Sequence, residues 1–218
     1  MNFEELKAEI LNRAKRKEVC EEFQTVQNAT TYSEILALSE KLFEWCWISK
    51  IIDLQLLQEF PLVNLQDANI YTGNVTISNP KTKVIIVPGA DVSIELFGNS
   101  RSEILCLGGF LSINSFENSF VKIKATFDSA LQINSFDNSI VQVSLIDNSV
   151  LNIKSNSNSN CHILAKNESI VTAELNETSF NYIKAHDKAT VNYIINDSAE
   201  IKIRQSDNST ITDNGIPL

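Results

Sequence analysis

A ten-residue repeat in the second half of this 218-residue chain limits what the chain can fold into. In most rows of ten, an apolar slot is followed two places later by a second apolar slot, and polar residues between them complete the alternation of a β-strand. Asp, Asn and Ser then interrupt each strand, because their side chains hydrogen-bond locally and tolerate turn geometry. Such short-period self-similarity indicates a stacked fold. The first slot holds Val121, Leu131, Val141, Leu151, Cys161, Val171, Asn181 and Val191.

One row is too short to enclose a hydrophobic core, so we expect two rows in each coil, about twenty residues. Each strand would then pair in parallel with the equivalent strand one coil away, about 4.8 Å along the axis. The fold class we predict is mainly β: a parallel β-solenoid, or β-helix. Ile133 and Ile153 should point into its core, and Gln132 and Gln142 should point outward.

The first sixty residues have helical periodicity instead. Asn2 with Glu5 and Thr31 with Glu34 match capping boxes, and apolar residues follow each pair at helical spacing. We therefore predict a helical head at 1–60 and a solenoid at 61–218, with irregular coils to about 109 and regular repeats at 110–212. The head is expected to cover the N-terminal end of the solenoid, since an open end exposes unpaired strand groups.

The segment "EWCW" in the head has two interpretations. Trp45 and Trp47 belong either to an aromatic core patch or to an exposed site where a protein partner docks. The cysteines of the chain are widely spaced, which indicates free buried thiols in a reducing compartment. They are Cys20, Cys46, Cys106 and Cys161.

The head sequence "FEELKAEILNRAKRKEVCEEFQTVQNATTYSEILALSEKLFEWCW", followed by decapeptides of the "DNSxVxIxS" type, resembles a group of functionally uncharacterised proteins common in gut Bacteroides and their phages. The resemblance covers nearly the whole chain, and the repeat is its more specific part. It implies a phage or mobile-element origin and supplies no active site to carry over.

The sequence contains few residue patterns that are typical of catalytic sites. The two histidines, His162 and His186, have different registers, so we expect them about one coil apart on different parts of the solenoid outline. A Ser or Cys nucleophile needs a nearby histidine oriented by a carboxylate. The sequence also has no Gly-rich phosphate loop, His-Glu-x-x-His motif or zinc-ligand spacing. We predict a non-enzymatic protein that uses no cofactor and no metal.

Six acidic residues share one slot of the repeat. Two rows per coil sort them onto two edges of the solenoid, where they would form hydrogen bonds with turn amides, make a binding edge, or act as the paired carboxylates of glycosidic cleavage. We favour the turn-forming role. One edge would carry Asp147, Asp187 and Asp207, and the other Asp137, Glu177 and Asp197.

The net charge of −9 argues against binding to a phosphate backbone, which needs a basic patch. The short run "RAKRK" is flanked by acids and is best interpreted as a solvated helix face. Lysines are interleaved with acids along the repeat, and we expect no basic patch there. An acidic rod that mimics DNA remains an alternative, although its charge density would be lower than that of a duplex.

Three functional classes stay open at this point. The first is a structural or protein-interaction module of phage or mobile-element origin that uses the rigid solenoid as a scaffold or binding surface. The second is an acidic, DNA-mimicking inhibitor of a nucleic-acid-binding enzyme, and the third is a carbohydrate-binding or carbohydrate-active β-helix.

Location and assembly follow from the same residues. Without a basic leader or an apolar stretch near the ~20 residues of a membrane span, we expect a cytoplasmic protein, or a virion-associated one. The last coil exposes Ile201, Ile203 and Ile211, followed by a short tail. We therefore expect a homodimer joined through the C-terminal coil.

Overall fold

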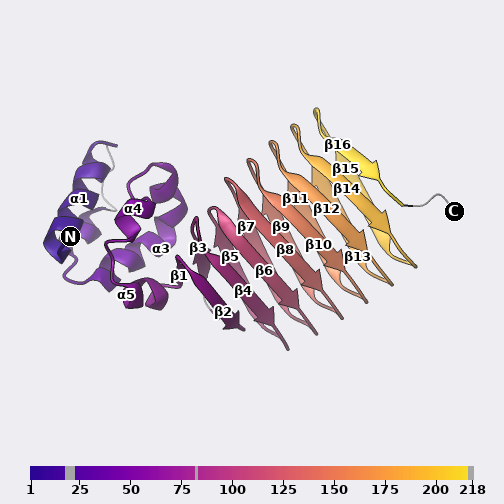
Figure 1. Ribbon diagram of the computed structural model, residues 1–218, viewed down its shortest axis with the longest axis horizontal. Helices are drawn as coiled ribbons and strands as arrows, with labels where there is room; N and C mark the ends of the chain where they lie inside the picture. The colour runs from indigo at the N-terminus through magenta and orange to yellow at the C-terminus, as the bar shows by residue number, and fades with distance from the viewer. Residues whose placement is uncertain (18–22, 82, 216–218) are drawn as a thin grey trace. The chain divides into compact units, whose positions relative to one another are not determined.

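The computed structural model describes residues 1–17, 23–81 and 83–215. The chain forms two compact units, Met1–Ile70 and Tyr71–Leu218. The first unit is helical, and the second consists of strands (Figure 1).

Both capping boxes predicted in the helical unit are confirmed. At the start of α1, the Asn2 side chain accepts from the Glu5 amide while the Glu5 carboxylate accepts from the Asn2 amide, and Thr31 with Glu34 does the same at α3. None of the helices in the described residues combines the length and apolar composition needed to cross a bilayer. The helices are α1 (Phe3–Lys15), α2 (Gln24–Asn28), α3 (Tyr32–Ile48), α4 (Leu54–Leu57) and α5 (Leu62–Asp67).

The solenoid begins later than the sequence indicates. Residues 62–67, which we predicted to lie in an early coil, form α5, and the first strand starts at Ile70. Pro61 is the residue that misleads: the preceding helix already ends at Leu57, and Pro61 occupies the N-cap position of the next helix. Proline is tolerated at a helix start because the first amides have no partner within the helix.

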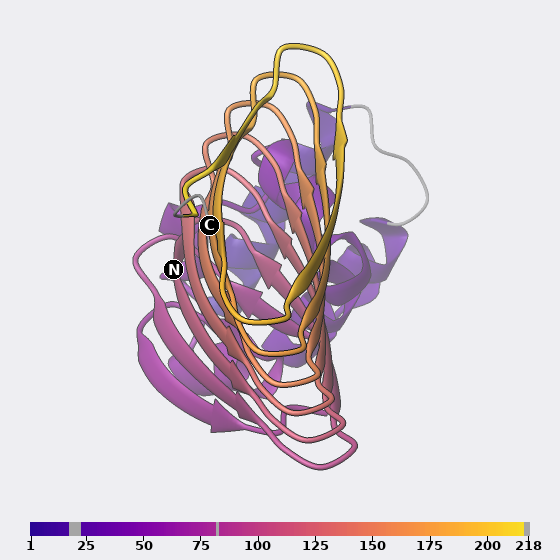
Figure 2. The same ribbon diagram turned by 90° about the vertical axis from the view of Figure 1, so that its right-hand side faces the viewer.

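Within the described residues, the strands form two parallel sheets of eight strands each, and Figure 2 shows every coil of the solenoid as a flattened loop with two long sides. Sheet A contains β1 (Ile70–Tyr71), β3 (Val84–Ile86), β5 (Arg101–Cys106), β7 (Phe120–Ala125), β9 (Ile140–Leu145), β11 (Asn160–Ala165), β13 (Phe180–Ala185) and β15 (Glu200–Gln205). Sheet B contains β2 (Asn74–Ser78), β4 (Asp91–Leu96), β6 (Gly109–Ser115), β8 (Ser129–Ser135), β10 (Val150–Ser155), β12 (Ile170–Leu175), β14 (Thr190–Ile195) and β16 (Thr210–Asp213).

The predicted coil of about twenty residues is confirmed by the strand register. Ile133 of β8 pairs with Ile153 of β10, and Val143 of β9 pairs with Ile163 of β11. Ile133 and Ile153 are at most 2% exposed, whereas Gln132 is exposed. The inward-facing aliphatic residues of both sheets therefore form one continuous core.

The repeated serine is explained by hydrogen bonds inside the coil. Ser119, Ser139 and Ser159 are fully buried, and each hydroxyl bonds to that of a serine four residues earlier at 2.8–2.9 Å. On the other side, Ser129 and Ser149 donate to carbonyls of their own turn and of the preceding coil. A small buried hydroxyl thus satisfies polar groups at both bends of the coil.

The turns explain the acidic slot. One residue of each regular turn has a left-handed backbone, with φ between 55° and 60°. Asp and Asn adopt this conformation more readily than other residues that have a β-carbon. The ten left-handed turn residues are Glu117, Phe127, Asp137, Asp147, Ser157, Asn167, Glu177, Asp187, Asp197 and Asp207.

Three of the cysteines are buried free thiols, as predicted: Cys46, Cys106 and Cys161. Burial raises the pKa of Cys46 and of Cys161 to about 11, and it also raises the pKa of Cys106. Cys20 lies outside the described residues.

Candidate functional site

A basic face covers the outer side of sheet A. Alternate residues of each strand point outward, and on this sheet the outward positions and the ends of the strands carry many cations. The acids among the outward strand positions from β5 to β15 are Glu103 and Glu200. The cations are Arg101, Lys122, Lys124, Lys166, Lys184, Lys202 and Arg204.

Sheet B presents a different surface. Its outward positions are occupied mainly by Ser, Thr, Asn and Gln, and Asn114 and Asn134 are bonded to each other through their amides at 2.9 Å. The lysine that the described residues place on this face is Lys154, whose Nζ atom lies 2.7 Å from a carboxylate oxygen of Glu174. The solenoid therefore separates charge between its two faces, although the chain as a whole is acidic.

The basic face is hollowed in three adjoining places, which together we call the basic groove. The middle hollow has a volume of about 490 Å³, and its lining includes Lys122, Lys166 and Lys184. The first hollow shares Lys122 with it and adds Lys83 and Arg101. The third shares Lys184 and adds Arg204. Shared lining residues join the hollows from β3 to β15, six strand spacings of about 4.8 Å, or roughly 29 Å along the axis.

Histidine and tyrosine rings lie in the same groove. His162 and Tyr182 make an edge contact with ring centroids 6.0 Å apart, and both line the middle hollow together with His186. As expected, the two histidines are one coil apart and occupy different positions on the outline: His162 lies within β11, and His186 follows β13 at the start of a turn. The hollow that both line was not predicted.

His186 also contacts a serine and a carboxylate that sequence reasoning missed. Its Nδ1 atom is hydrogen-bonded to the Ser206 hydroxyl and lies 3.7 Å from Asp207, and Ser206 donates to Asp207 at 3.1 Å. In an acyl-transfer triad, the serine and the carboxylate occupy opposite nitrogens of the imidazole. Here both face Nδ1, so the cluster lacks that arrangement. The signal in the sequence is the spacing of twenty residues between His186 and Ser206.

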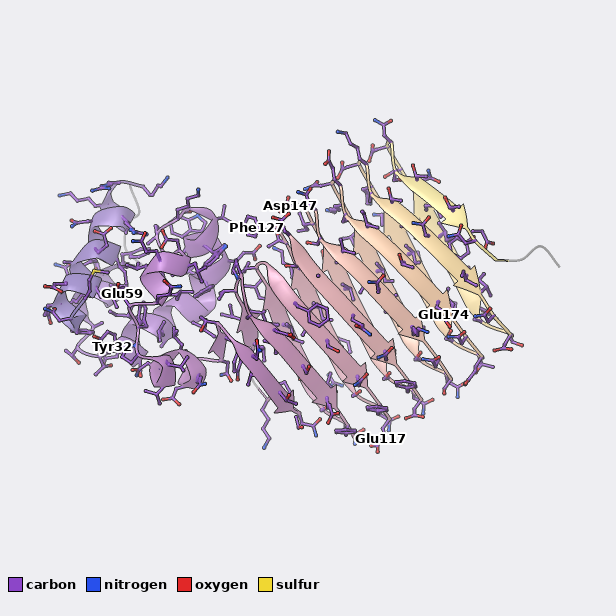
Figure 3. The ribbon with its side chains drawn as sticks, in the orientation of Figure 1. Tyr32, Glu59, Glu117, Phe127, Asp147 and Glu174 are labelled. Atoms are coloured by element: carbon purple, nitrogen blue, oxygen red, sulfur yellow. The ribbon has the colours of Figure 1, made fainter. Side chains whose placement is uncertain are left out.

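The six turn acids lie on two edges, as their spacing predicted, and Figure 3 shows Asp147 and Glu117 at opposite edges of the stack. Their observed partners are on the neighbouring coil: the amide of Glu117 donates to Asp137 at 2.9 Å, and that of Asn167 donates to Asp187 at 3.1 Å. We expected bonds within the same turn. A binding role for these edges stays a prediction. Asp147, Asp197 and Asp207 accept in the same way from Phe127, Glu177 and Asp187.

Two of these carboxylates are stabilised in the ionised form. The Thr126 hydroxyl, at 2.7 Å, lowers the pKa of Asp147, and the backbone amide of Phe127 and the side-chain amide of Asn167 add to the effect. The Ser206 hydroxyl, with smaller effects from the Asp187 amide and from His186, lowers the pKa of Asp207. The bonds of Asp147 to Thr126, Phe127 and Asn167 and that of Asp207 to the Asp187 amide link successive coils, so the ionised carboxylates contribute to the stacking of the solenoid. Among the described residues, no group of three or more His, Cys, Asp or Glu side chains could hold a metal ion.

The two tryptophans of the head do not form a single patch. Trp45 is 40% exposed and meets Phe23 edge-on, whereas Trp47 is half-buried and stacks on Phe43 at 6.1 Å. Residues two apart on a helix do not share a face. Docking of a protein partner at these tryptophans stays a prediction.

The basic groove was not predicted. When read in rows of ten, lysines and acids alternate without order, and we expected no basic patch. That expectation is wrong, because the fold repeats every twenty residues and sends alternate rows to opposite faces. Sorting the basic residues by the longer period would have found the groove.

A scan against protein-family models, a search of the curated proteins and a search of the solved structures each find no match to this chain.

Proposed function

We propose that this protein is a non-enzymatic interaction module, in which a rigid β-solenoid holds a basic groove that binds an extended polyanion. The observation that supports this is the alignment of cations on the outer face of sheet A, from Lys83 to Arg204, while the outer face of sheet B is mainly polar and carries the acids Asp91, Glu95 and Glu174. Lysines of like charge repel one another, so gathering them on one face has an electrostatic cost that a bound polyanion offsets.

The rigidity of the scaffold suits a linear ligand. Strands of sheet A follow one another at a fixed spacing, so the cations occupy fixed positions along an axis instead of lying on mobile loops. A polymer with regularly spaced charges can then contact several of them without ordering the protein, which reduces the entropic cost of binding.

The other two classes have less support. A nucleic-acid mimic would display the carboxylates of the solenoid edges, but these accept hydrogen bonds from backbone amides of the next coil. A sugar-binding platform needs an exposed ring face. At an edge of sheet B, Phe97, Phe116 and Phe136 stack on one another with centroids 5.2 and 5.0 Å apart, so the facing sides of these rings are covered and only the end of the stack, where Phe97 is 39% exposed, is open.

The proposal includes an origin and a location. The resemblance of the head and the decapeptides to proteins of gut Bacteroides and their phages supports a phage or mobile-element origin. A cytoplasmic or virion-associated location is part of the same proposal.

Retention on immobilised polyanions tests the function. The probes are polyphosphate, polygalacturonate and single-stranded oligo(dT), each washed with rising salt. The test variant is Lys166→Gln/Lys184→Gln, in the groove. The matched control is Lys154→Gln/Lys188→Gln, which removes the same charge from sheet B and from a turn where Lys188 pairs with Glu168.

The wild-type chain and the control should bind at least one polyanion at low salt, and the groove variant should bind about tenfold more weakly. Surface ion pairs contribute little to stability, so all three proteins should fold alike. Equal losses in the two double variants, or no binding by the wild-type chain, would refute the proposal.

A further inference from the structure

We infer that the polyanion is a single-stranded nucleic acid, whose phosphates lie along the basic groove and whose bases stack on aromatic side chains beside it. This inference rests on the proposed function and narrows it to one ligand class. It comes from a second feature of sheet A, an apolar stripe formed by Phe120, Ile140 and Phe180.

The apolar stripe runs parallel to the cations. Phe120, Ile140 and Phe180 each occupy the first outward position of their strand, and Asn160 of β11 interrupts the stripe between Ile140 and Phe180. Ile140 is 38% exposed and Phe180 is 41% exposed.

Most of the cations occupy later outward positions, and Lys184 is four residues beyond Phe180, about 13 Å along β13. Arg101 is different, because it pairs with Phe120 in the first outward position. His162 and Tyr182 occupy the second outward position, which also holds Lys122 in β7 and Lys202 in β15.

Two parallel rows match the chemistry of an unpaired strand. A nucleotide carries its phosphate and its base on opposite sides of the sugar, so a single strand is itself a charged row beside an aromatic row. Proteins that bind single strands combine a positive groove with aromatic side chains on which bases stack. The roughly 29 Å of groove is of the order needed for a site of a few nucleotides.

Competing polyanions fit less well. In a duplex, each base already stacks on its neighbours, so it offers no face to Phe180 or Tyr182. A polyuronate carries its carboxylates on the sugar rings themselves and therefore has no separate apolar row. The carboxylates of Asp147, Asp187 and Asp207 border the groove on the side away from Phe180. They would repel a phosphate backbone that left the row of cations on that side.

Two phenylalanines provide a matched test. Phe180→Ser removes a ring from the apolar stripe, and Phe110→Ser removes an equally exposed ring, at 37% against 41%, from the outer face of sheet B. Phe180→Trp keeps and enlarges the ring. Binding of fluorescein-labelled oligo(dT) about twenty nucleotides long is measured by anisotropy, with a hairpin duplex, polygalacturonate and phosphatidylserine vesicles as competitors.

Oligo(dT) should bind most tightly of the four ligands. Phe180→Ser should weaken its binding roughly five- to 150-fold, the effect of one lost base stack, whereas Phe110→Ser and Phe180→Trp should retain it. Lys166→Gln should reduce the slope of log K against log salt by about 0.7, the value for one phosphate contact on a single strand.

The inference is overturned if Phe180→Ser and Phe110→Ser behave alike, or if the duplex, polygalacturonate or vesicles bind more tightly than oligo(dT). The proposed function survives those outcomes as long as Lys166→Gln/Lys184→Gln loses a polyanion that the control double variant keeps. Both fall together if the wild-type chain binds none of the ligands.

Discussion

Replacing a core isoleucine with alanine should lower the free energy of unfolding strongly inside the solenoid, and only slightly at the equivalent position one coil further on. Ile183 of β13 and Ile203 of β15 are register partners on neighbouring strands, and both point inward. Ile183 is fully buried in the core, whereas Ile203 is partly exposed. Ile183→Ala and Ile203→Ala therefore compare the same chemical change in the same slot at two levels of burial.

The difference can be estimated from burial. The change removes three carbons, worth about 0.8 kcal/mol each when fully buried, or about 2.4 kcal/mol. At Ile183 a cavity remains between packed strands, which brings the cost to roughly 3–4 kcal/mol. At Ile203 about half of the transfer energy is lost and water fills the space, so the cost is about 1 kcal/mol.

Hydrogen exchange resolved by peptide mass is the suitable assay. The chain has two units and repeats that contact mainly their neighbours, so one global transition cannot be assumed. Amides of β11 to β15 should exchange on the order of a hundred times faster in Ile183→Ala and about five times faster in Ile203→Ala. Outward Lys202→Ala, next to Ile203, is the control and should change little.

Similar losses at the two positions would refute the link between burial and cost. A large loss at Ile203 that grows as the protein is diluted would show that another subunit covers this coil, and the exposure of the single chain would then be the wrong basis.

The homodimer proposed through the last coil should appear in sedimentation at micromolar concentration, and Ile211→Lys should convert it to a monomer; a wild-type monomer would contradict it. Thr126→Val should destabilise the protein above pH ~4 but not at lower pH. The reason is that the Thr126 hydroxyl holds the pKa of Asp147 below its usual 3.8, so its bond to the carboxylate stops contributing to stability as the pH falls through the pKa of the folded protein. If the urea midpoints of the variant and the wild-type chain differed by the same amount at every pH, this reasoning would be contradicted. Cys161 should resist a maleimide at pH 8 and react fully in concentrated urea, as mass spectrometry of its peptide would show, because burial keeps the thiol protonated and inaccessible; rapid labelling of the native protein would contradict this.

The interior of the solenoid was predictable because both sheets obey the same ten-residue pattern. Ile133 of sheet B and Ile163 of sheet A occupy the same slot of the ten-residue row, and both belong to the core. The core residues can therefore be found without knowing which row belongs to which sheet. The left-handed turns have a local cause as well, and the acids at these positions follow from backbone geometry. Local periodicity is enough for both features.

Contacts between coils were harder to predict. The bond of Ser206 with His186 and the bond of Asp137 with the Glu117 amide join residues one coil apart. Neither pair is near in sequence, and side chains at turns have several possible acceptors. Pro61 misled for a related reason: whether a proline is followed by a strand or by a second helix depends on what that segment packs against, as α5 shows.

The basic groove escaped detection because nothing in the fold requires it. Outward positions tolerate many polar residues, so lysines follow no pattern within a row, and they align only when rows are assigned alternately to sheets A and B. The ten-residue period determines which residues point into the core, and the twenty-residue period determines which outward residues share a face.

Two deletion variants would distinguish the effect of the ten-residue period from that of the twenty-residue period. Removal of 146–165 takes out one whole coil, β10 and β11, and leaves β12 to stack on β8 and β13 on β9. Lys122, Lys166 and Lys184 then stay on one face. Removal of 146–155 takes out only β10, so every later strand changes sheet. The two aliphatic inward slots of each strand still match, but Lys166 and Lys184 leave the face that carries Lys122.

Both deletion variants should therefore fold, with the parallel β-sheet signal in circular dichroism reduced in proportion to the residues removed. The whole-coil deletion should bind the polyanion with nearly wild-type affinity, and the single-strand deletion should bind about tenfold more weakly because its cations are divided between two faces. Equal binding by both variants would mean that the alignment of cations on sheet A does not matter for binding. Unfolding of the single-strand deletion alone would mean that the two sheets have distinct interiors, and that the ten-residue period does not by itself determine the core.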